Sequence, residues 1–376
     1  LKAAESQLAR LNFESAEASF LQAIANGVVD VARVRIRYAN ALALAGRRID
    51  AARLLVQSAA ELPEDKIHLQ LRATEFLLSA GAMEEGIGVL KPMLAGVGLS
   101  HPGGNALALM EVVAGLARLR FAPRRAKPLD EERLALCLAP MKGLSAIDPV
   151  RSTTYAMRAL SFARRLGDRQ AEIFCRSYLG LVLGFSGVKR LETMGARMVE
   201  EAMKASESDD AAARTWVRAV RGIQLVGRCR WREGYRQIQV AFDEDDGSRA
   251  DVHWEKAAAD TTQLLAVQSM GDYRQLEDHA RRLLDVGEAR NDLFVVVESN
   301  IYLADALLAA DRPARARRTL EAAMERWHAE SFAFQDWLGA HVRIRIMLYE
   351  RQGEAAREEF ERAVRLAKKE GMLNVR

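Results

Sequence analysis

The sequence predicts an all-α protein, an α-solenoid built from stacked antiparallel helical hairpins. Two observations lead to this prediction. Ala, Leu, Arg and Glu, which lose little side-chain entropy in a helix, dominate a chain in which aromatic residues make up only 6%. Glycine-containing turns also recur along the chain, each between two stretches whose apolar residues repeat with helical spacing.

One hairpin can be followed residue by residue in the stretch LLAADRPARARRTLEAAMERW. After the turn, Ala316, Leu320 and Trp327 fall on one face of a helix, with charged residues on the other face. Asp311 is predicted to cap this helix, and Pro313 fits its first turn, where a missing N–H costs nothing. The stretch before the turn has an apolar stripe of its own, which predicts a helix–turn–helix unit.

Similar turns recur along the chain. The predicted pivots are Gly46, Gly81, Gly167, Gly187, Gly227, Gly271, Asp311 and Gly353. The spacings from 46 to 81, 227 to 271, 271 to 311 and 311 to 353 are 35, 44, 40 and 42 residues, and such periods are typical of tetratricopeptide (TPR)-like hairpins. Ala16, Phe20 and Ala23 also follow the small–large–small pattern of the second helix in such a repeat.

Proline positions suggest how the chain is divided. Six of the eight prolines lie between residues 92 and 149, where they favour irregular connections over helix interiors. We therefore expect TPR-like repeats over 1–97, an irregular, basic connecting segment over 98–149, and a helical-hairpin array over 150–376. The chain opens on Leu within an amphipathic helical pattern, so we expect it to be a piece of a longer protein.

Charge and cysteine content narrow the class of protein. The 55 basic and 51 acidic residues give a net charge of +4, which indicates a mixed surface rather than one built for a polyanion. Three widely spaced cysteines favour a reducing compartment, and we expect a cytoplasmic location. No apolar run reaches the roughly 18 residues of a membrane helix, so we expect no membrane partner.

Sequence motifs of catalysis are absent. The chain has no GxxxxGK[ST] phosphate-binding loop, no HExxH, no nucleophile elbow and no protein-kinase motif. Its six histidines show no metal-ligand spacing with cysteines or carboxylates. We therefore expect no enzymatic activity, no cofactor and no metal ion in this chain.

An arginine cluster is the first candidate for a partner-binding site. Arg214, Arg218 and Arg221 are spaced to share one helix face, and Arg230 and Trp231 follow them. Basic groups beside aromatic rings can hold phosphates and stack on bases. The balanced net charge favours the alternative, in which these arginines pair with acidic residues of neighbouring repeats.

Three further tryptophans stand at helical spacing. Trp254 and Trp337 are candidates for contact with a ligand on a concave surface. Large residues in a stack of hairpins are more often core wedges between adjacent repeats, and Trp327 is predicted to be such a structural wedge.

Three stretches of the sequence resemble the same protein family: LSAIDPVRSTTYAMRALSFARRLGD, VHWEKAAADTTQLLAVQSMGDYRQL and RNDLFVVVESNIYLADALLAADRPARARRTLEAAMERW. They are similar to the C-terminal region of large bacterial serine/threonine protein kinases that carry a central STAND-type ATPase and end in TPR-like repeats. The resemblance runs from about residue 105 to about residue 357. Its most specific marks are Asp148, Pro149, Trp254, Glu255, Gly271, Asn291, Asp292, Tyr302, Asp311, Pro313, Trp327 and Tyr349.

The resemblance implies a regulatory arm that holds an ATPase closed until a ligand binds. Such an arm must bind its ligand with different affinity in the closed and open states. We therefore expect a non-catalytic sensor scaffold for a protein or peptide ligand or for other domains of the same polypeptide, with ligand-dependent oligomerisation. Kinase and ATPase signatures are themselves missing from this chain.

Two alternatives stay open. In the first alternative, the chain is a nucleic-acid-associated arm of a STAND transcription regulator and acts through the basic stretch 214–236. In the second it is the ligand-recognition arm of an NLR-like antiviral defence sensor. Binding through the basic stretch would weaken steeply with salt, whereas the sequence does not separate a defence sensor from an ordinary signalling arm.

Overall fold

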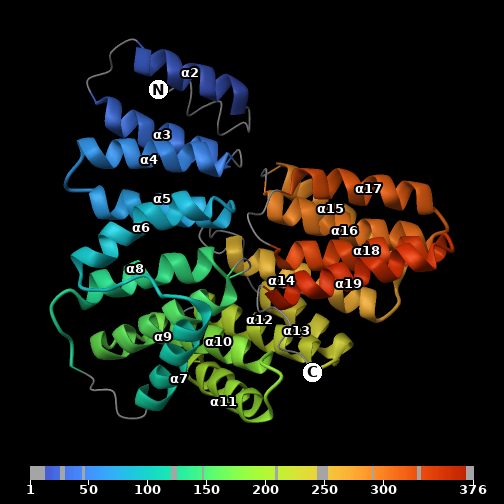
Figure 1. Ribbon diagram of the computed structural model, residues 1–376. Coiled ribbons are helices and arrows are strands. Elements are labelled where there is room, and N and C mark those ends of the chain that lie inside the picture. Colours follow the sequence, from blue (N-terminus) through green and yellow to red (C-terminus); the bar gives the residue numbers. More distant parts are fainter. Residues whose placement is uncertain are drawn as a thin grey trace. The chain divides into compact units, whose positions relative to one another are not determined.

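The computed structural model confirms the predicted all-α solenoid of stacked helical hairpins (Figure 1). It describes residues 13–25, 30–44, 47–119, 125–145, 148–207, 211–243, 253–289, 292–327 and 332–369. Within these ranges the chain forms 18 helices, α2 to α19, and no strand. None of the helices described is both long and apolar enough to cross a membrane.

The chain divides into two compact units according to its internal contacts. Unit 1 consists of residues 1–114, 127–155 and 288–292. Unit 2 consists of residues 115–126, 156–287 and 293–376. The division passes through two helices, α7 and α9, so each of them contributes residues to both units.

Unit 1 contains the first helices of the chain. They are α2 (Phe13–Ala25), α3 (Val31–Leu44), α4 (Arg48–Glu61), α5 (Lys66–Ser79), α6 (Met83–Gly96), α8 (Asp130–Gly143) and the first parts of α7 (Asn105–Leu119) and α9 (Pro149–Leu166). One core runs from α2 to α5, and Phe20, Leu55 and Leu77 in it are fully buried. The apolar residues of these helices recur every three to four positions, which directs them to that core.

Unit 2 is the longer array of hairpins. Its helices after α9 are α10 (Arg169–Gly184), α11 (Lys189–Ser206), α12 (Ala211–Gly227), α13 (Trp231–Asp243), α14 (His253–Ser269), α15 (Tyr273–Ala289), α16 (Leu293–Ala309), α17 (Pro313–Arg326), α18 (Phe334–Tyr349) and α19 (Gly353–Lys369). The first helices of successive hairpins contact one another in order, α10 with α12, then α14, α16 and α18. The second helices take part as well, since α11 contacts α12, α13 contacts α14 and α17 contacts α18, so each hairpin packs on the next through both of its helices.

Two hairpins of unit 2 repeat the same close helix crossing. In α10 and α11, a Cβ on Gly195 would lie 2.5 Å from the carbonyl oxygen of Gly180. In α12 and α13, a Cβ on Gly234 would lie 2.7 Å from the carbonyl oxygen of Gly222. No side chain fits at these distances, so glycine is required at the same point of both hairpins.

Left-handed residues mark the hairpin turns, as the sequence predicts for four of its pivots. Their φ angles lie between 68° and 83° at Gly81, Gly167, Gly187 and Gly271. Glycine enters this region without a Cβ clash, which ends the first helix and reverses the chain. The pivot predicted at Gly46 lies outside the described residues.

Two predicted pivots are wrong in detail. The left-handed residues of those turns are Cys229, with φ 60°, and Arg351, with φ 63°, rather than Gly227 and Gly353. Gly227 ends α12 at a point where a Cβ would lie 1.9 Å from the Phe185 ring. Close packing between hairpins, and not the conformation of the turn, therefore explains why position 227 is a glycine.

Asp311 does not cap α17, contrary to the prediction. It has a left-handed φ of 59°, and Arg312 occupies the N-cap position. Pro313 is the first helical residue, as predicted. The Asp311 carboxylate accepts a hydrogen bond from the Tyr349 hydroxyl, which joins this turn to the end of α18.

The proline-rich part of the chain is more helical than its prolines suggest. Helices α7 and α8 together account for most of segment 98–149. Pro140 lies inside α8, and Pro92, which precedes the segment, lies inside α6. Each proline lies in the last turns of its helix, so the backbone hydrogen bond that it removes is near the helix end. Prolines at such positions do not exclude a helix.

Candidate functional site

Helix α7 presents an apolar face to solvent. Leu107, Leu109, Met110 and Val113 are between 56% and 60% exposed, which is unusual for four large apolar residues on one helix. At 3.6 residues per turn they lie within an arc of about 160° around the helix axis. We call these four residues the α7 apolar face.

The opposite side of α7 rests on α9 through small residues. Ala108 is fully buried and Val112 nearly so. The Thr154 hydroxyl of α9 donates a hydrogen bond to the Ala108 carbonyl at 3.3 Å. A Cβ on Gly115 would lie 2.3 Å from Met157 Cγ, so the α7 backbone approaches α9 closely there. This narrow contact leaves the apolar face uncovered.

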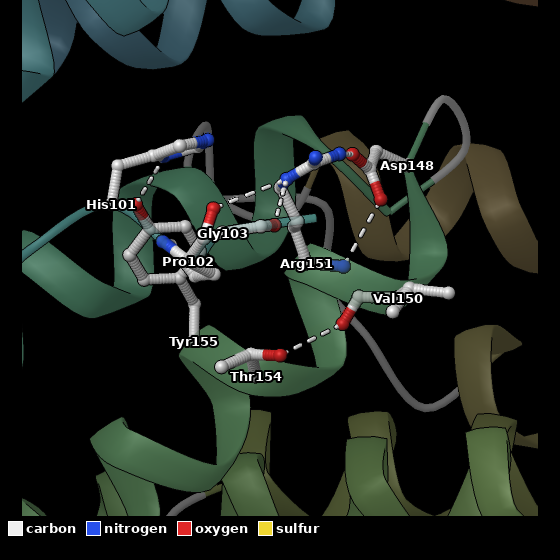
Figure 2. A network of polar contacts seen from close by, with 8 residues as sticks. All are labelled: His101, Pro102, Gly103, Asp148, Val150, Arg151, Thr154 and Tyr155. Atoms are coloured by element: carbon white, nitrogen blue, oxygen red, sulfur yellow. Dashed lines mark hydrogen bonds and ion pairs between the residues drawn. The ribbon is translucent and has the colours of Figure 1, made fainter. Parts of the chain in front are cut away.

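The loop before α7 is fixed to the start of α9 by a polar network (Figure 2). The Arg151 guanidinium donates from Nε to the carbonyl oxygens of Pro102 and Gly103 at 3.3 and 3.2 Å. His101 Nδ1 and the hydroxyl of the fully buried Tyr155 are 2.8 Å apart. These contacts hold the chain immediately before Asn105, and therefore set where α7 begins.

Arg151 is itself held in place by Asp148. The Asp148 carboxylate accepts a hydrogen bond from the Arg151 backbone N–H at 3.0 Å and forms an ion pair with its guanidinium (Figure 2). The first of these bonds caps the N-terminus of α9. One acidic side chain thus stabilises both the helix end and the arginine that binds the loop.

Positive charge follows the α7 apolar face along the chain. Arg118 is exposed in the last turn of α7. Residues 120–127, RFAPRRAK, contain four basic residues and no acidic one. Of these, Arg125 and Lys127 are within the described residues and are exposed. The chain thus passes from an apolar surface to a basic segment within a few residues.

The arginines predicted as a binding site lie on α12 and at the start of α13. Arg221 pairs with Glu200 of α11 at 2.9 Å, and Arg230 forms an ion pair with Glu233. Arg214 and Arg218 also interact with other groups of the protein. The arrangement is that of arginines with partners inside the protein, and their role in binding stays a prediction.

The predicted tryptophans belong to different hairpins. Trp231 is half-buried against the core between α12 and α14, and Trp337 is half-buried on α18. Trp327 follows α17, packs against the core around α16 and donates from Nε1 to Asp336 Oδ2 at 3.3 Å. The Trp254 side chain lies outside the described residues. Trp327 and Trp337 thus belong to hairpins other than the α12–α13 hairpin of the arginines, and a binding role for the tryptophans stays a prediction.

The sequence reasoning missed the α7 apolar face. The prolines of residues 98–149 predict an irregular connection, and the arginines predicted to bind a partner lie further along the chain, over 214–230. A signal was present, because NALALMEVVAGLARL has apolar residues all around the helix and only two charges. Such a pattern indicates either a fully enclosed helix or one with an uncovered apolar face, and only the fold distinguishes the two.

Comparisons with known proteins add no family to this description. No protein-family model matches the chain, and the search of curated proteins finds no match to it. Within the described residues no three His, Cys, Asp or Glu side chains are grouped so that they could hold a metal ion.

Proposed function

We propose that this chain is a non-catalytic interaction scaffold whose α7 apolar face binds an amphipathic helix of a protein partner. The observation that carries the proposal is the exposure of Leu107, Leu109, Met110 and Val113 on one helix. An uncovered apolar patch on a folded protein marks an interaction surface or an aggregation hazard. Helical repeats that present such surfaces are typical of protein-binding scaffolds.

The shape of the surface favours a helical segment as the ligand. Leu107, Met110 and Val113 are each three residues apart, so they form a ridge along α7. An amphipathic helix can lay its apolar stripe beside such a ridge with anchors at intervals of three and four residues. Each large apolar side chain removed from water contributes about 1.5–3 kcal/mol when it becomes fully buried.

The positive charge that follows the ridge in the sequence favours a partner with acidic residues. Arg118 and the four basic residues of 120–127 follow the apolar face, and no acidic residue lies among them. Complementary charge at the edge of an interface raises the association rate and fixes orientation. The proposed ligand is therefore a helix with one apolar face and acidic residues at the end nearest Arg118.

The resemblance to the repeat arm of STAND ATPase–kinases gives this scaffold a context. We propose that the partner helix belongs to another domain of the same polypeptide or to a protein ligand that signals through it. Nucleic-acid binding through residues 214–236 has less support, because Arg221 and Arg230 already have acidic partners in the protein. We propose the same mode of binding, a partner helix on the α7 apolar face, whether the parent protein acts in signalling or in defence.

Site-specific photo-crosslinking tests the proposal directly. A photoreactive phenylalanine analogue would replace Met110 in the chain, and the same analogue would replace Leu348 as a matched control. Leu348 is 57% exposed on α18, close to the 59% of Met110, and lies in the other unit. We expect position 110 to crosslink, in lysate of the source cells, to a segment that mass spectrometry identifies as apolar and acidic.

A synthetic peptide of the crosslinked segment then provides a quantitative test. Fluorescence anisotropy should show that Leu107→Asp weakens peptide binding by more than about tenfold, since the change removes apolar contact and adds a like charge. Leu348→Asp should leave the affinity unchanged. Crosslinks at position 110 to lipid or to basic segments, or no crosslinks beyond those at position 348, would contradict the proposal.

A further inference from the structure

Two neighbouring turns of unit 2, α10–α11 and α12–α13, hold an aromatic ring at the protein surface. Phe185 directly follows α10, and Gly227 is the last residue of α12. The ring atoms Cε1, Cζ and Cδ1 of Phe185 lie 1.9, 2.5 and 3.0 Å from the point that a Cβ on Gly227 would occupy. One edge of the ring therefore rests on the Gly227 backbone, while the residue remains 50% exposed.

Both turns are rich in positive charge. Residues 185–192 and 227–233 together contain five basic and two acidic residues. Of the two acidic residues, Glu233 pairs with Arg230, and Glu192 offsets at most one further charge. The other four basic side chains are exposed and form no ion pair among the residues that the structure describes; they are Lys189, Arg190, Arg228 and Arg232. We call Phe185 together with these four residues the paired-turn surface.

Helix stability does not explain the position of these cations. Lys189 and Arg190 are the first two residues of α11, and Arg232 is the second residue of α13. The helix dipole favours acidic side chains at a helix N-terminus and disfavours basic ones. The cations of the paired-turn surface are therefore placed against the local electrostatic preference of their helices.

We propose that the paired-turn surface binds single-stranded nucleic acid, with one base stacked on Phe185 and the adjacent phosphates beside the cations of the two turns. Aromatic rings flanked by cations are typical of such surfaces, because every base has a face that can stack. The surface differs from the basic stretch 214–236 predicted from the sequence. Phe185 and the cations of α11 lie outside that stretch, and the paired Arg221 and Arg230 have no part in the surface.

Fluorescence anisotropy with the whole chain and a labelled oligothymidylate of about ten nucleotides tests the proposal. We expect saturable binding that weakens with salt, with a slope of log K against log[salt] of about −2 to −3, since about three or four phosphates are neutralised. An oligomer of the same length without bases keeps the phosphates and should bind at least about fivefold more weakly, because stacking is lost.

Two results of this titration would overturn the proposal. Equal affinity for the oligomers with and without bases would show a surface that recognises negative charge alone, as an acidic protein segment would also provide. Absence of binding at low salt would show that the cations do not attract a polyanion.

Variants in each turn separate the contributions of the ring and of the charges. Phe185→Leu keeps an apolar side chain against Gly227 and should weaken binding at least about fivefold, because the stacking face is removed. Phe360→Leu on α19 is the matched control, since Phe360 is 53% exposed. Arg228→Gln should reduce the salt slope by about 0.7, whereas Arg315→Gln on α17 should leave it unchanged.

Thermal unfolding in parallel identifies any variant that fails to fold. Unchanged affinity in folded Phe185→Leu would contradict the stacking of a base on this ring and overturn the proposal.

A native cysteine reports where the oligomer binds. Cys229 lies next to Arg228 in the α12–α13 turn and is exposed, whereas Cys137 and Cys175 are buried. Iodoacetamide should therefore modify Cys229 first, because access limits the reaction of the other thiols. We expect saturating oligothymidylate to slow alkylation of Cys229 several-fold, as measured by peptide mass spectrometry. Binding with an unchanged rate at Cys229 would place the oligomer elsewhere and overturn the proposal.

Discussion

Helices α7 and α16 are similar in sequence and opposite in environment. Each is largely apolar and carries two charged residues, Glu111 and Arg118 in α7 and Glu298 and Asp305 in α16. From residue 295 to 308, every residue of α16 except Asn300 is buried, whereas α7 exposes four large apolar side chains.

The difference between the two helices comes from their neighbours. One core cluster brings together residues of α14, α15, α16, α17 and α18, so α16 is enclosed. The contacts described for α7 are with α9, through Ala108 and Gly115. Apolar composition therefore predicts that a helix needs partners, and the fold decides whether the chain supplies them.

The largest contrast should appear on truncation of one side chain in each helix. Ile301→Ala in α16 should lower the free energy of unfolding by about 3 kcal/mol, because Ile301 is 1% exposed and its loss leaves a cavity. Met110→Ala in α7 should change it by less than about 0.5 kcal/mol, since the side chain is already in water. Urea unfolding followed by circular dichroism measures the free energy of unfolding of both variants. An equal decrease in the two variants would contradict the difference in environment between α7 and α16.

The buried charge of α16 provides the next largest effect. The Asp305 side chain has no exposed surface and accepts hydrogen bonds from Gln268 at 2.6 Å and from Arg345 at 2.5 Å. Arg345→Met should cost about 3 kcal/mol, because it leaves a buried carboxylate without its cation. Adding Asp305→Asn should recover part of this loss.

An exposed arginine is the control for that experiment. Arg365→Met on α19 removes a surface ion pair with Glu361, in which both side chains are at least half exposed. It should change the stability by less than about 0.5 kcal/mol. Similar losses for Arg345→Met and Arg365→Met would show that Asp305 does not depend on its cation.

Acidic pH should destabilise unit 2 through His279. Burial first, and then the positive charges of Arg282 and Lys256, lower the pKa of His279 to about 4, whereas an unfolded histidine titrates near about 6.5. The unfolded state therefore binds the proton first, and stability falls as pH decreases from about 6.5 towards 4. We expect a loss of about 1–2 kcal/mol between pH 7 and 5.

Thermal unfolding of wild-type protein and His279→Gln across this pH range measures that contribution. Glutamine does not titrate, so the variant should lose the part of the pH dependence that belongs to His279. The same dependence in both proteins would show that other groups cause it.

The network before α7 should have a smaller effect on stability and a local effect on α7. Tyr155→Phe removes the contact with His101 Nδ1 and should cost about 1 kcal/mol. Hydrogen exchange should become faster in the first turns of α7, which the loop holds in place. Tyr349→Phe is the control, because this hydroxyl lies on a half-exposed residue, and its loss should leave exchange in α7 unchanged.

The sequence contains enough information for the repeats and for many of their turns. The hairpin period, the left-handed glycines such as Gly271, and Pro313 at the start of α17 all follow from local rules of helix geometry. Several marks of the family resemblance have the same local origin. Asp148 caps α9, and Asp311 occupies a left-handed turn.

The features that carry the proposals and the predictions depend on contacts between distant residues. Gly227 is glycine because Phe185 lies against it, and Arg221 is paired because Glu200 lies on the neighbouring helix. The environment of His279 requires α13 and α14 to be in place, and the exposure of Met110 depends on which helices fail to cover it. Local spacing does not encode these contacts, so the sequence pointed to arginines instead.

Methionine oxidation tests the central claim most directly, because the chain contains its own reference residues. Met110 on α7 is 59% exposed, whereas Met141 on α8 is fully buried. On brief treatment of the free protein with hydrogen peroxide, peptide mass spectrometry should show that Met110 oxidises fast and Met141 slowly, and a bound partner helix should protect Met110. Protection of Met110 equal to that of Met141 in the free protein would contradict an uncovered α7 apolar face.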